Sequence, residues 1–567
     1  MRPKKLSIQF ANQKDRNEIY KLRYEIYAEE LCQHLQSEAY CLQDELDAHN
    51  TYIVVKIENE LAGFVSITSP GGAYGIDKYL SREEYPFLYH NMYEGRLLTV
   101  IKKYRGSSIV VLLMLAMLRF VETQSGQKIM IYGREDLLGF YKKVGFTDLD
   151  RTIQSGAVTF KLMLATISEL KKKVIHFEPI SHRLLPKVDN KLPFSLKTDP
   201  ICYHGGEFFQ AVGNEFDSLD KKNSIINADV LDAWFDPSPK VVEALLEYLP
   251  WIIKTSPPTH AEGLLHIISQ TRHLPKATIL TGGGSSDLMF LSFPNLLGKN
   301  SRVLLLNPTY GEYTHILNHV IHCQVDTFPL SKENEYKVSL EDFITSIQTK
   351  KYDMVILVNP NSPTGQCLLK EEMMSIIKNL PSETFLWIDE TYIEYANNIN
   401  SIESVAANQK NVLVCKSMSK VYALSGVRCA YLVAHPDIIH RLQIFSPPWA
   451  VSLPAQIAGV HALQDPKYYQ KCYQKTDSNR TQLLEALKSI SCIKVMTGVT
   501  NSLLCEFPIS IPVQHILEDC KKYGLYIRDI TNMGLNTDTN IARISIKNHE
   551  TNQRIIHILQ KVITQYK

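Results

Sequence analysis

The residues of this chain best suited to chemistry lie in the stretch SMSKVYALSGVR, which runs from Ser417 to Arg428. A lysine that forms an imine with an aldehyde cofactor needs a fixed position, a way to lose its proton, and small neighbours that leave room for a flat ring. Lys420 follows two serines, and a short apolar strand at 412–415 leads into it. Arg428 offers a planar fork that suits a phosphate group. The alternative for this stretch alone is a surface lysine after a buried strand.

The elements that must position Lys420 alternate between apolar runs and polar turns from about residue 201 onward. Near-continuous apolar runs such as VLLL and MVILV are typical of strands covered on both faces by helices. Ligands bind at the carboxyl edge of such sheets. Five polar signatures follow strands in this half of the chain, namely GGGSSD, NPTYGEY, NPNSPTG, IDETYIEY and SMSK…R.

These five signatures, in this order, resemble those of the fold-type-I aminotransferases that depend on pyridoxal 5′-phosphate. The resemblance is closest to the histidinol-phosphate aminotransferase and threonine-phosphate decarboxylase branch, and it covers about residue 227 to the end. It implies an α/β fold for residues 201–567, with a parallel-rich large domain at about 235–443. A smaller α/β domain at about 444–567 would close over the site. The family also implies a homodimer.

The resemblance implies a phosphate site at the turn that opens a helix after GGG. Backbone N–H groups at a helix amino terminus bind phosphate well, and a plain glycine-rich turn is the alternative. The residues implied for this end of the cofactor are Gly284, Ser285, Ser286, Ser417, Ser419 and Arg428.

The same resemblance implies contacts to the cofactor ring. Tyr310 would stack on the ring, Asp389 would pair with the protonated ring nitrogen, and Tyr392 would hydrogen-bond the phenolic oxygen. The usual Asn-Pro-Thr-Gly of the family has serine in its first place here, so either Ser362 or Asn361 takes the role of that asparagine or this contact to the cofactor is missing.

Two arginines near the carboxyl end are implied as substrate ligands. Arg543, in IARISIKN, lies at the substrate-carboxylate position of the family, where a guanidinium binds a carboxylate by two parallel hydrogen bonds. Arg528, in GLYIRDI, lies where relatives use an arginine for a carboxylate or a phosphate; an ordinary strand arginine is the alternative.

The reaction expected is transamination of an amino acid or amino-acid phosphate, with a 2-oxo acid as acceptor. Lys420 would bind the cofactor and then act as the base that moves a proton from the α-carbon. Decarboxylation by the same residues is the alternative. A cofactor-binding transcription regulator is less favoured, because the first 160 residues contain no basic recognition helix.

The first part of the chain, residues 1–167, alternates strands and helices and resembles the GNAT acyltransferase superfamily. The turn at Arg105, Gly106, Ser107 and Ser108 precedes a long apolar helix, where the family binds acetyl-CoA or another acyl-CoA. Tyr141 falls at the position of the general acid, and Glu94 is a possible base. The alternative for Tyr141 is a packing tyrosine, and the alternative for Glu94 is an exposed strand residue. The whole domain could also be a docking domain without activity.

Length and composition set the remaining expectations. A chain of 567 residues holds about two to four domains, and 168–200 is expected to be a linker. The 61 basic and 59 acidic residues nearly cancel, so no nucleic-acid partner is expected. The 11 cysteines have no metal-ligand spacing, and no apolar run is long enough for a membrane span. We therefore expect a bifunctional, cytoplasmic enzyme without a metal.

Overall fold

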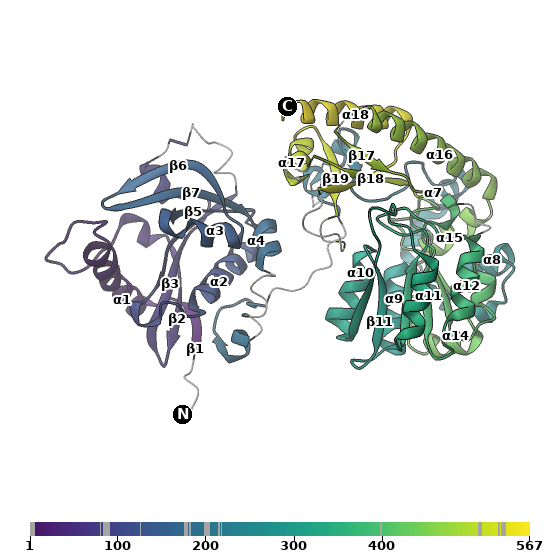
Figure 1. The fold of residues 1–567 in the computed structure, drawn as a ribbon, viewed down its shortest axis with the longest axis horizontal. Helices are drawn as coiled ribbons and strands as arrows, with labels where there is room; N and C mark the ends of the chain where they lie inside the picture. The colour runs from purple at the N-terminus through teal and green to yellow at the C-terminus, as the bar shows by residue number, and fades with distance from the viewer. Residues whose placement is uncertain are drawn as a thin grey trace. The chain divides into compact units, whose positions relative to one another are not determined.

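The computed structural model of the chain (Figure 1) divides into two compact units, Met1–Asp199 and Pro200–Lys567. Each unit is described by itself below. The structure describes residues 6–79, 81–82, 91–124, 126–174, 180, 183–197, 205–213, 216, 218–396, 400–490, 492–508, 513–530, 533 and 540–566.

The first unit is built on a mixed sheet of eight strands in the order β6-β7-β5-β4-β3-β2-β1-β8. Neighbouring strands are antiparallel except for the pairs β4·β5 and β1·β8, which are parallel. The strands are β1 (Leu6–Phe10), β2 (Thr51–Ile57), β3 (Glu60–Thr68), β4 (Met92–Val100), β5 (Lys128–Arg134), β6 (Thr147–Ser155), β7 (Val158–Thr166) and β8 (Val188–Asn190).

The helix α2 (Ile109–Thr123) forms the centre of this unit's core. Its apolar side chains are almost all buried against β2, β3 and β4, which explains why the sequence IVVLLMLAML is apolar around the whole helix. The other α-helices of the unit are α1 (Gln13–Arg23), α3 (Leu138–Val144) and α4 (Ile167–Val174).

The segment expected as a linker, 168–200, contributes elements to the first unit. Most of α4 lies in it and contacts α2, and β8 pairs with β1 at the edge of the sheet. Residues 175–179, 181–182 and 198–200 of this segment lie outside the described residues.

The second unit contains the predicted helix-covered sheet. Its seven strands lie in the order β10-β16-β15-β14-β13-β11-β12, and all pairs are parallel except the two formed by β16. The strands are β10 (Ile279–Gly282), β11 (Arg302–Asn307), β12 (Gln324–Pro329), β13 (Met354–Val358), β14 (Phe385–Asp389), β15 (Val412–Ser417) and β16 (Ala430–Ala434). The fully buried VLLL and MVILV runs, in β11 and β13, confirm the sequence interpretation of strands covered on both faces.

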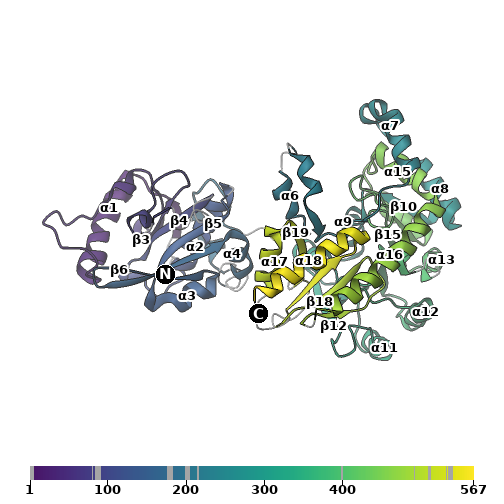
Figure 2. The same ribbon diagram turned by 90° about the horizontal axis from the view of Figure 1, so that it is seen from above.

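Helices cover this sheet on both faces, and α7, α8 and α15 pack together beside it (Figure 2). The helices of this unit are α6 (Phe208–Val212), α7 (Pro239–Lys254), α8 (Glu262–Arg272), α9 (Ser285–Leu296), α10 (Gly311–His315), α11 (Leu340–Thr349), α12 (Lys370–Asn379), α13 (Glu403–Ala406), α14 (Pro436–Gln443), α15 (Leu453–Leu463), α16 (Pro466–Lys488), α17 (Val513–Lys522) and α18 (His549–Thr564).

A second, smaller sheet has five strands in the order β17-β18-β20-β19-β9. Four of them come from the carboxyl end of the chain, but β9 precedes the large sheet in sequence and pairs in parallel with β19. The strands are β9 (Ile226–Ala228), β17 (Lys494–Met496), β18 (Ser502–Glu506), β19 (Leu525–Asp529) and β20 (Ile541–Ser545). Residues just after β9 therefore lie where the small sheet meets the large one.

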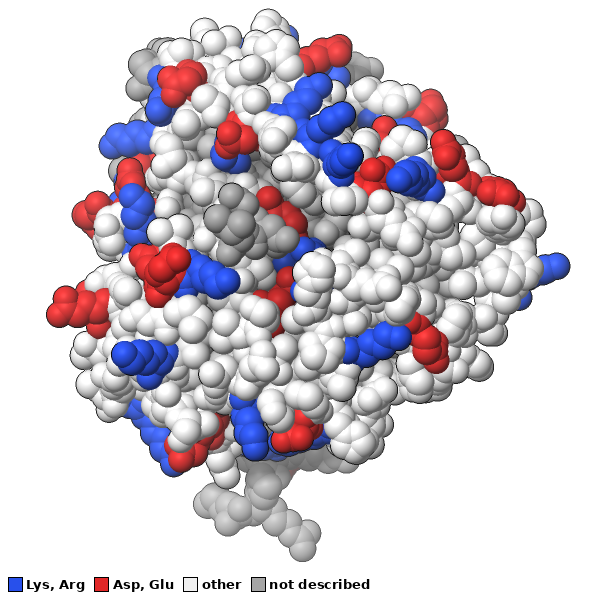
Figure 3. All heavy atoms as spheres, turned by 90° about the vertical axis from the view of Figure 1, so that its right-hand side faces the viewer, with Lys and Arg blue, Asp and Glu red and all other residues white. Residues whose placement is uncertain are grey.

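The face drawn in Figure 3 carries acidic and basic side chains side by side, without a large field of one sign. No helix in the described part of the chain combines the length and the apolar character that a membrane span requires.

Candidate functional site

Lys420 lies just beyond the carboxyl end of β15, as its sequence position suggested. Its Nζ donates a hydrogen bond to Oδ1 of Asp232 at 2.8 Å, and the two side chains keep 20% and 36% of their surface exposed. Its backbone carbonyl accepts a hydrogen bond from Tyr395 at 2.8 Å, which fixes the turn that carries it. The amine is thus held in place and is open on one side.

Asp389 ends β14, the strand next to β15, and its carboxylate is buried. Oδ2 accepts a hydrogen bond from the Tyr313 hydroxyl at 2.8 Å, and Oδ1 accepts bonds from the backbone and hydroxyl of Thr391. Burial raises the pKa of Asp389 even though these bonds act to lower it. No lysine, arginine or histidine among the described residues pairs with this carboxylate. A cationic ring nitrogen would compensate it.

The glycine turn after β10 opens the 12-residue helix α9 at Ser285, as predicted. Gly284 has φ +117°, a conformation that only glycine adopts readily, and a Cβ there would overlap the Arg428 guanidinium. The helix has no side-chain cap at this end. Arg428 donates to the backbone carbonyl of Ser425 at 3.2 Å and lies 3.5 Å from Oγ of Ser419. The backbone N–H groups at the start of α9 and the guanidinium of Arg428 therefore lie beside each other, an arrangement that suits an anion.

Tyr310 and Ser286 share one buried acceptor that the sequence reading did not identify. The Tyr310 hydroxyl and the Ser286 hydroxyl donate to Oε2 of Glu312 at 2.8 and 2.9 Å. This contact ties the turn after β11 to the start of α9. Burial, together with Glu312, raises the pKa of Tyr310 well above its ordinary value, so its phenol stays protonated.

Asn361 and Ser362, the two alternatives at the departure from Asn-Pro-Thr-Gly, have different partners. The Asn361 amide bonds to the carbonyl of Pro308 at 3.0 Å and accepts from the Thr309 hydroxyl at 3.0 Å, so it links two turns. Ser362 Oγ accepts a hydrogen bond from Nη1 of Arg543 at 3.0 Å. Asn361 thus lies in the framework of the site, and Ser362 orients the arginine.

Arg543 on β20 is buried, and its second terminal nitrogen donates to the backbone carbonyl of Asp229 at 3.0 Å. Burial lowers the pKa of Arg543 to about 10, although Tyr392 and Asp229 act to raise it. Arg528, on the neighbouring strand β19, lies 3.4 Å from Oδ1 of Asp229. The two arginines therefore converge on the segment that follows β9.

Electrostatic coupling links these groups into one site. Burial raises the pKa of Tyr392; Arg543 acts to lower it, while Asp389 and Asp232 act to raise it. Tyr392 is thus within electrostatic range of the buried acid, the arginine and the partner of Lys420. Sequence reasoning missed three acidic residues. Asp229 and Asp232 belong to no signature and have partners far away in sequence. Glu312 lies within NPTYGEY, but nothing in that signature shows that it accepts from Ser286 on another element.

The residues of this site fit pyridoxal 5′-phosphate. The buried Asp389 carboxylate suits a protonated ring nitrogen, the helix amino terminus with Arg428 suits a phosphate, and Lys420 suits an aldehyde carbon. No group of three or more His, Cys, Asp or Glu residues that could hold a metal ion occurs in the described parts of the chain.

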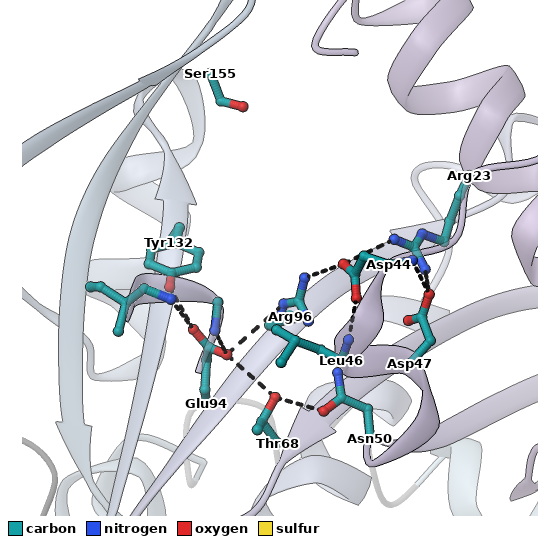
Figure 4. Close-up of polar contacts among 12 residues, drawn as sticks. Arg23, Asp44, Leu46, Asp47, Asn50, Thr68, Glu94, Arg96, Tyr132 and Ser155 are labelled. Carbon is teal, nitrogen blue, oxygen red and sulfur yellow. Dashed lines mark hydrogen bonds and ion pairs between the residues drawn. The ribbon is translucent and has the colours of Figure 1, made fainter. Parts of the chain in front are cut away.

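Glu94, on β4 of the first unit, is fully buried and hydrogen-bonded (Figure 4). Its carboxylate accepts bonds from the backbone N–H groups of Gly75 and Ile76 at 2.7 and 3.0 Å and from the Tyr132 hydroxyl at 2.5 Å. Arg96 lies 3.9 Å away and bonds to Asp44 at 2.7 Å. These contacts indicate a structural role for Glu94 in addition to the predicted role as a base.

Figure 4 also shows that the ionic contacts continue from Asp44 to the amino-terminal helices. Arg23 lies 3.4 Å from Asp44 and 2.6 Å from Asp47, and Asp47 also accepts from the Tyr52 hydroxyl at 2.5 Å. No sequence signature marks these residues, since their spacing follows no helical or strand period. The first unit therefore contains a chain of alternating charges around Glu94.

The predicted acyl-CoA residues lie at the start of α2. Gly106 has φ +81° with open space where a Cβ would stand, and Ser108 precedes the first helical residue. Arg105 is exposed and forms a two-pronged ion pair with Glu30. Ser107 Oγ lies 3.5 Å from the backbone nitrogen of Ile109. Tyr141 lies on α3, and burial raises its pKa to about 12, with a further contribution from Tyr27.

Comparison with known proteins agrees with this geometry. A model of the aminotransferase class I and II family matches residues 231–559, and a model of the acetyltransferase (GNAT) domain matches residues 22–115. The histidinol-phosphate aminotransferase of Methanocaldococcus jannaschii is 27% identical over 346 residues, which cover 61% of this chain and 91% of the relative.

Two solved structures share the fold of the second unit. The histidinol-phosphate aminotransferase from Sinorhizobium meliloti, in complex with pyridoxal 5′-phosphate, has a TM-score of 0.56 at 18% identity and covers 65% of this chain and 100% of that one. The L-threonine-O-3-phosphate decarboxylase from Porphyromonas gingivalis has a TM-score of 0.53 at 21% identity and covers 60% of this chain and 100% of that one.

Proposed function

The chain belongs to the aminotransferase class I and II family, and from this premise we propose that Lys420 is the catalytic lysine of a pyridoxal-phosphate-dependent aminotransferase. The enzyme transfers the amino group of an amino acid or amino-acid phosphate to a 2-oxo acid. The observation that carries the assignment is the convergence of three groups around Tyr392: the buried carboxylate of Asp389, the guanidinium of Arg543, and the amine of Lys420 through its partner Asp232.

Each residue has a distinct part in this mechanism. Pyridoxal phosphate, when bound, supplies an aldehyde carbon for primary amines and a ring that draws electrons from the substrate α-carbon. Asp389 keeps the ring nitrogen protonated, and Tyr313 and Thr391 hold the carboxylate in place. Arg543 binds the substrate carboxylate and so orients the α-carbon toward Lys420. The Lys420 amine would take the proton from the substrate α-carbon and hold it beside the reacting atoms for its return.

The test of this function is a visible spectrum of the purified protein with a panel of amino acids and amino-acid phosphates. We expect a yellow band that is lost with one donor and returns when a 2-oxo acid is added. Release of carbon dioxide, without any need for an oxo acid, would instead identify a decarboxylase.

We further propose that the first unit transfers an acyl group from acyl-CoA to an amine, so that the chain is bifunctional. The support is the GNAT match together with the open turn at Gly106 and the protonated phenol of Tyr141. A fusion of these two units suits amine formation followed by N-acylation on one molecule.

Replacing Tyr141 with phenylalanine should lower acyl transfer by about 10²-fold, because a positioned acid contributes roughly 10²–10⁴-fold. Transamination by the full chain should be unchanged. Thiol release from acetyl-CoA, measured with the amine product, tests this. The exposed Tyr79 provides the matched control, Tyr79→Phe. If the unaltered protein does not acylate the amino product of transamination, the acyltransferase proposal fails.

The apolar face of α7 supports a homodimer. Leu246, Leu249 and Ile253 follow one side of the helix at spacings of three and four residues, and they expose 66%, 40% and 73% of their surface. Apolar side chains gathered in this way indicate a protein interface. Light scattering should give twice the chain mass of 64.7 kDa, and Leu246→Glu with Ile253→Glu should shift the protein to the single mass. A single mass for the unaltered protein would contradict the dimer.

All ten cysteines in the described residues are free thiols. Reduced thiols are usual in a reducing compartment, which supports a location in the cytoplasm.

A further inference from the structure

The carboxylate of Asp232 has no part in the mechanism above, although it is the group that contacts the catalytic amine. Oδ1 lies 2.8 Å from Nζ of Lys420. Asp232 lies in an extended segment, four residues beyond β9, and keeps 36% of its side-chain surface exposed. It is therefore held beside the reacting position without being enclosed.

The charges around Asp232 keep it ionised. Burial acts to raise its pKa, but the charge of Lys420 and the hydrogen bond from its amine lower the pKa below the ordinary value, and Lys547 adds to this effect. Burial lowers the pKa of Lys547 to about 8; Asp232 acts to raise it and Lys420 to lower it. The carboxylate therefore faces two amines, one of which is Lys420.

We propose that Asp232 recognises the cationic amino group of the amino donor. This inference rests on the proposed function, in which the Lys420 amine and the donor amine must reach the same carbon atom in turn. Because Asp232 lies at hydrogen-bond distance from the Lys420 amine, it is also within reach of the donor amine. An arriving donor is an ammonium ion at neutral pH, as lysine itself is.

Asp232 and Arg543 together match the two charges of an amino acid. Arg543 is the buried guanidinium for the α-carboxylate, and Asp232 is the partly exposed carboxylate for the α-ammonium. A 2-oxo acid carries the negative carboxylate but has no ammonium group. Asp232 therefore acts in the half-reaction that starts from the donor and has no role in binding the acceptor. We describe it as a specificity-determining residue.

The experiment uses the cofactor-loaded full chain and two simple amines in place of the unidentified donor. Methylamine is cationic at pH 7.5, whereas hydroxylamine is neutral. The measurement is the rate at which each amine displaces Lys420, followed by the loss of the visible band. In Asp232→Asn, displacement by methylamine should slow by about tenfold to a hundredfold, because a hydrogen bond to a charged group contributes about 1.5–3 kcal/mol. Displacement by hydroxylamine should change less than threefold.

Two further variants complete the design. Asp232→Glu keeps the charge and should recover part of the methylamine rate. Asp236→Asn removes an exposed acid four residues further on and should change neither rate. Equal rates with methylamine in Asp232→Asn and the unaltered protein, or equal slowing with both amines, would overturn the inference. A purified protein in which Lys420 never binds the cofactor would overturn the proposed function, and the premise of this inference with it.

Discussion

Replacing Lys420 with alanine lowers the single-turnover rate of transamination by at least roughly 10³-fold, since proton transfer by a positioned base contributes about 10²–10⁴-fold. The variant still binds pyridoxal phosphate, because the phosphate end of the site, with Gly284 and Arg428, is unchanged. The bound cofactor has the absorbance of the free aldehyde, since no lysine is attached to it. Stopped-flow absorbance with the identified donor measures both effects.

The matched control for this variant is Lys410→Ala, which removes a lysine that is 80% exposed. Its rate and spectrum should equal those of the unaltered protein. Turnover by Lys420→Ala within tenfold of the unaltered rate would show that another amine of the chain is the base.

Replacing Asp389 with asparagine has the second largest effect. It weakens cofactor binding, but it stabilises the cofactor-free protein. Loss of the carboxylate leaves a protonated ring nitrogen without a partner, so the dissociation constant for pyridoxal phosphate rises by about 10²–10³-fold, as for a broken buried ion pair of about 3–5 kcal/mol. Turnover falls at least as far, since the ring no longer withdraws electrons. Equilibrium titration of the visible band measures the affinity.

The stability of the cofactor-free protein should increase in the same variant. Burial raises the pKa of Asp389, so ionisation of this carboxyl group destabilises the cofactor-free fold as the pH rises above the ordinary aspartate pKa. Asparagine removes this charge, and the melting temperature of the cofactor-free variant should rise. Tyr313→Phe, which removes one hydrogen bond from the carboxylate, should weaken cofactor binding only about fivefold. Cofactor binding by Asp389→Asn at the unaltered affinity would contradict the role of the charge.

The sequence predicted the class of fold and the family correctly, because both depend on local patterns. Apolar runs of strand length, each followed by a polar turn, indicated a helix-covered parallel sheet, and the structure confirms it. Lys420 and Asp389 could be identified from the sequence because each lies at or just after the end of a predicted strand. Their roles remain predictions until the variants above are measured.

The contacts that could not be predicted join residues distant in sequence. Asp232 is separated from Lys420 by 188 positions, and Arg543 from Ser362 by 181. The chain of charges around Glu94 likewise crosses several elements. No local periodicity specifies such pairs, because only the folded topology brings their elements together.

The position of β9 has a consequence for the order in which the protein folds during synthesis. This strand leaves the ribosome before the large sheet does, yet its neighbour β19 is made only after that sheet; Asp229 and Arg528 are 299 positions apart. Until then β9 is an unpaired edge of only three residues, too short to template much aggregation. The second unit therefore joins Asp229 to Arg528 only after the large sheet and β19 have both emerged.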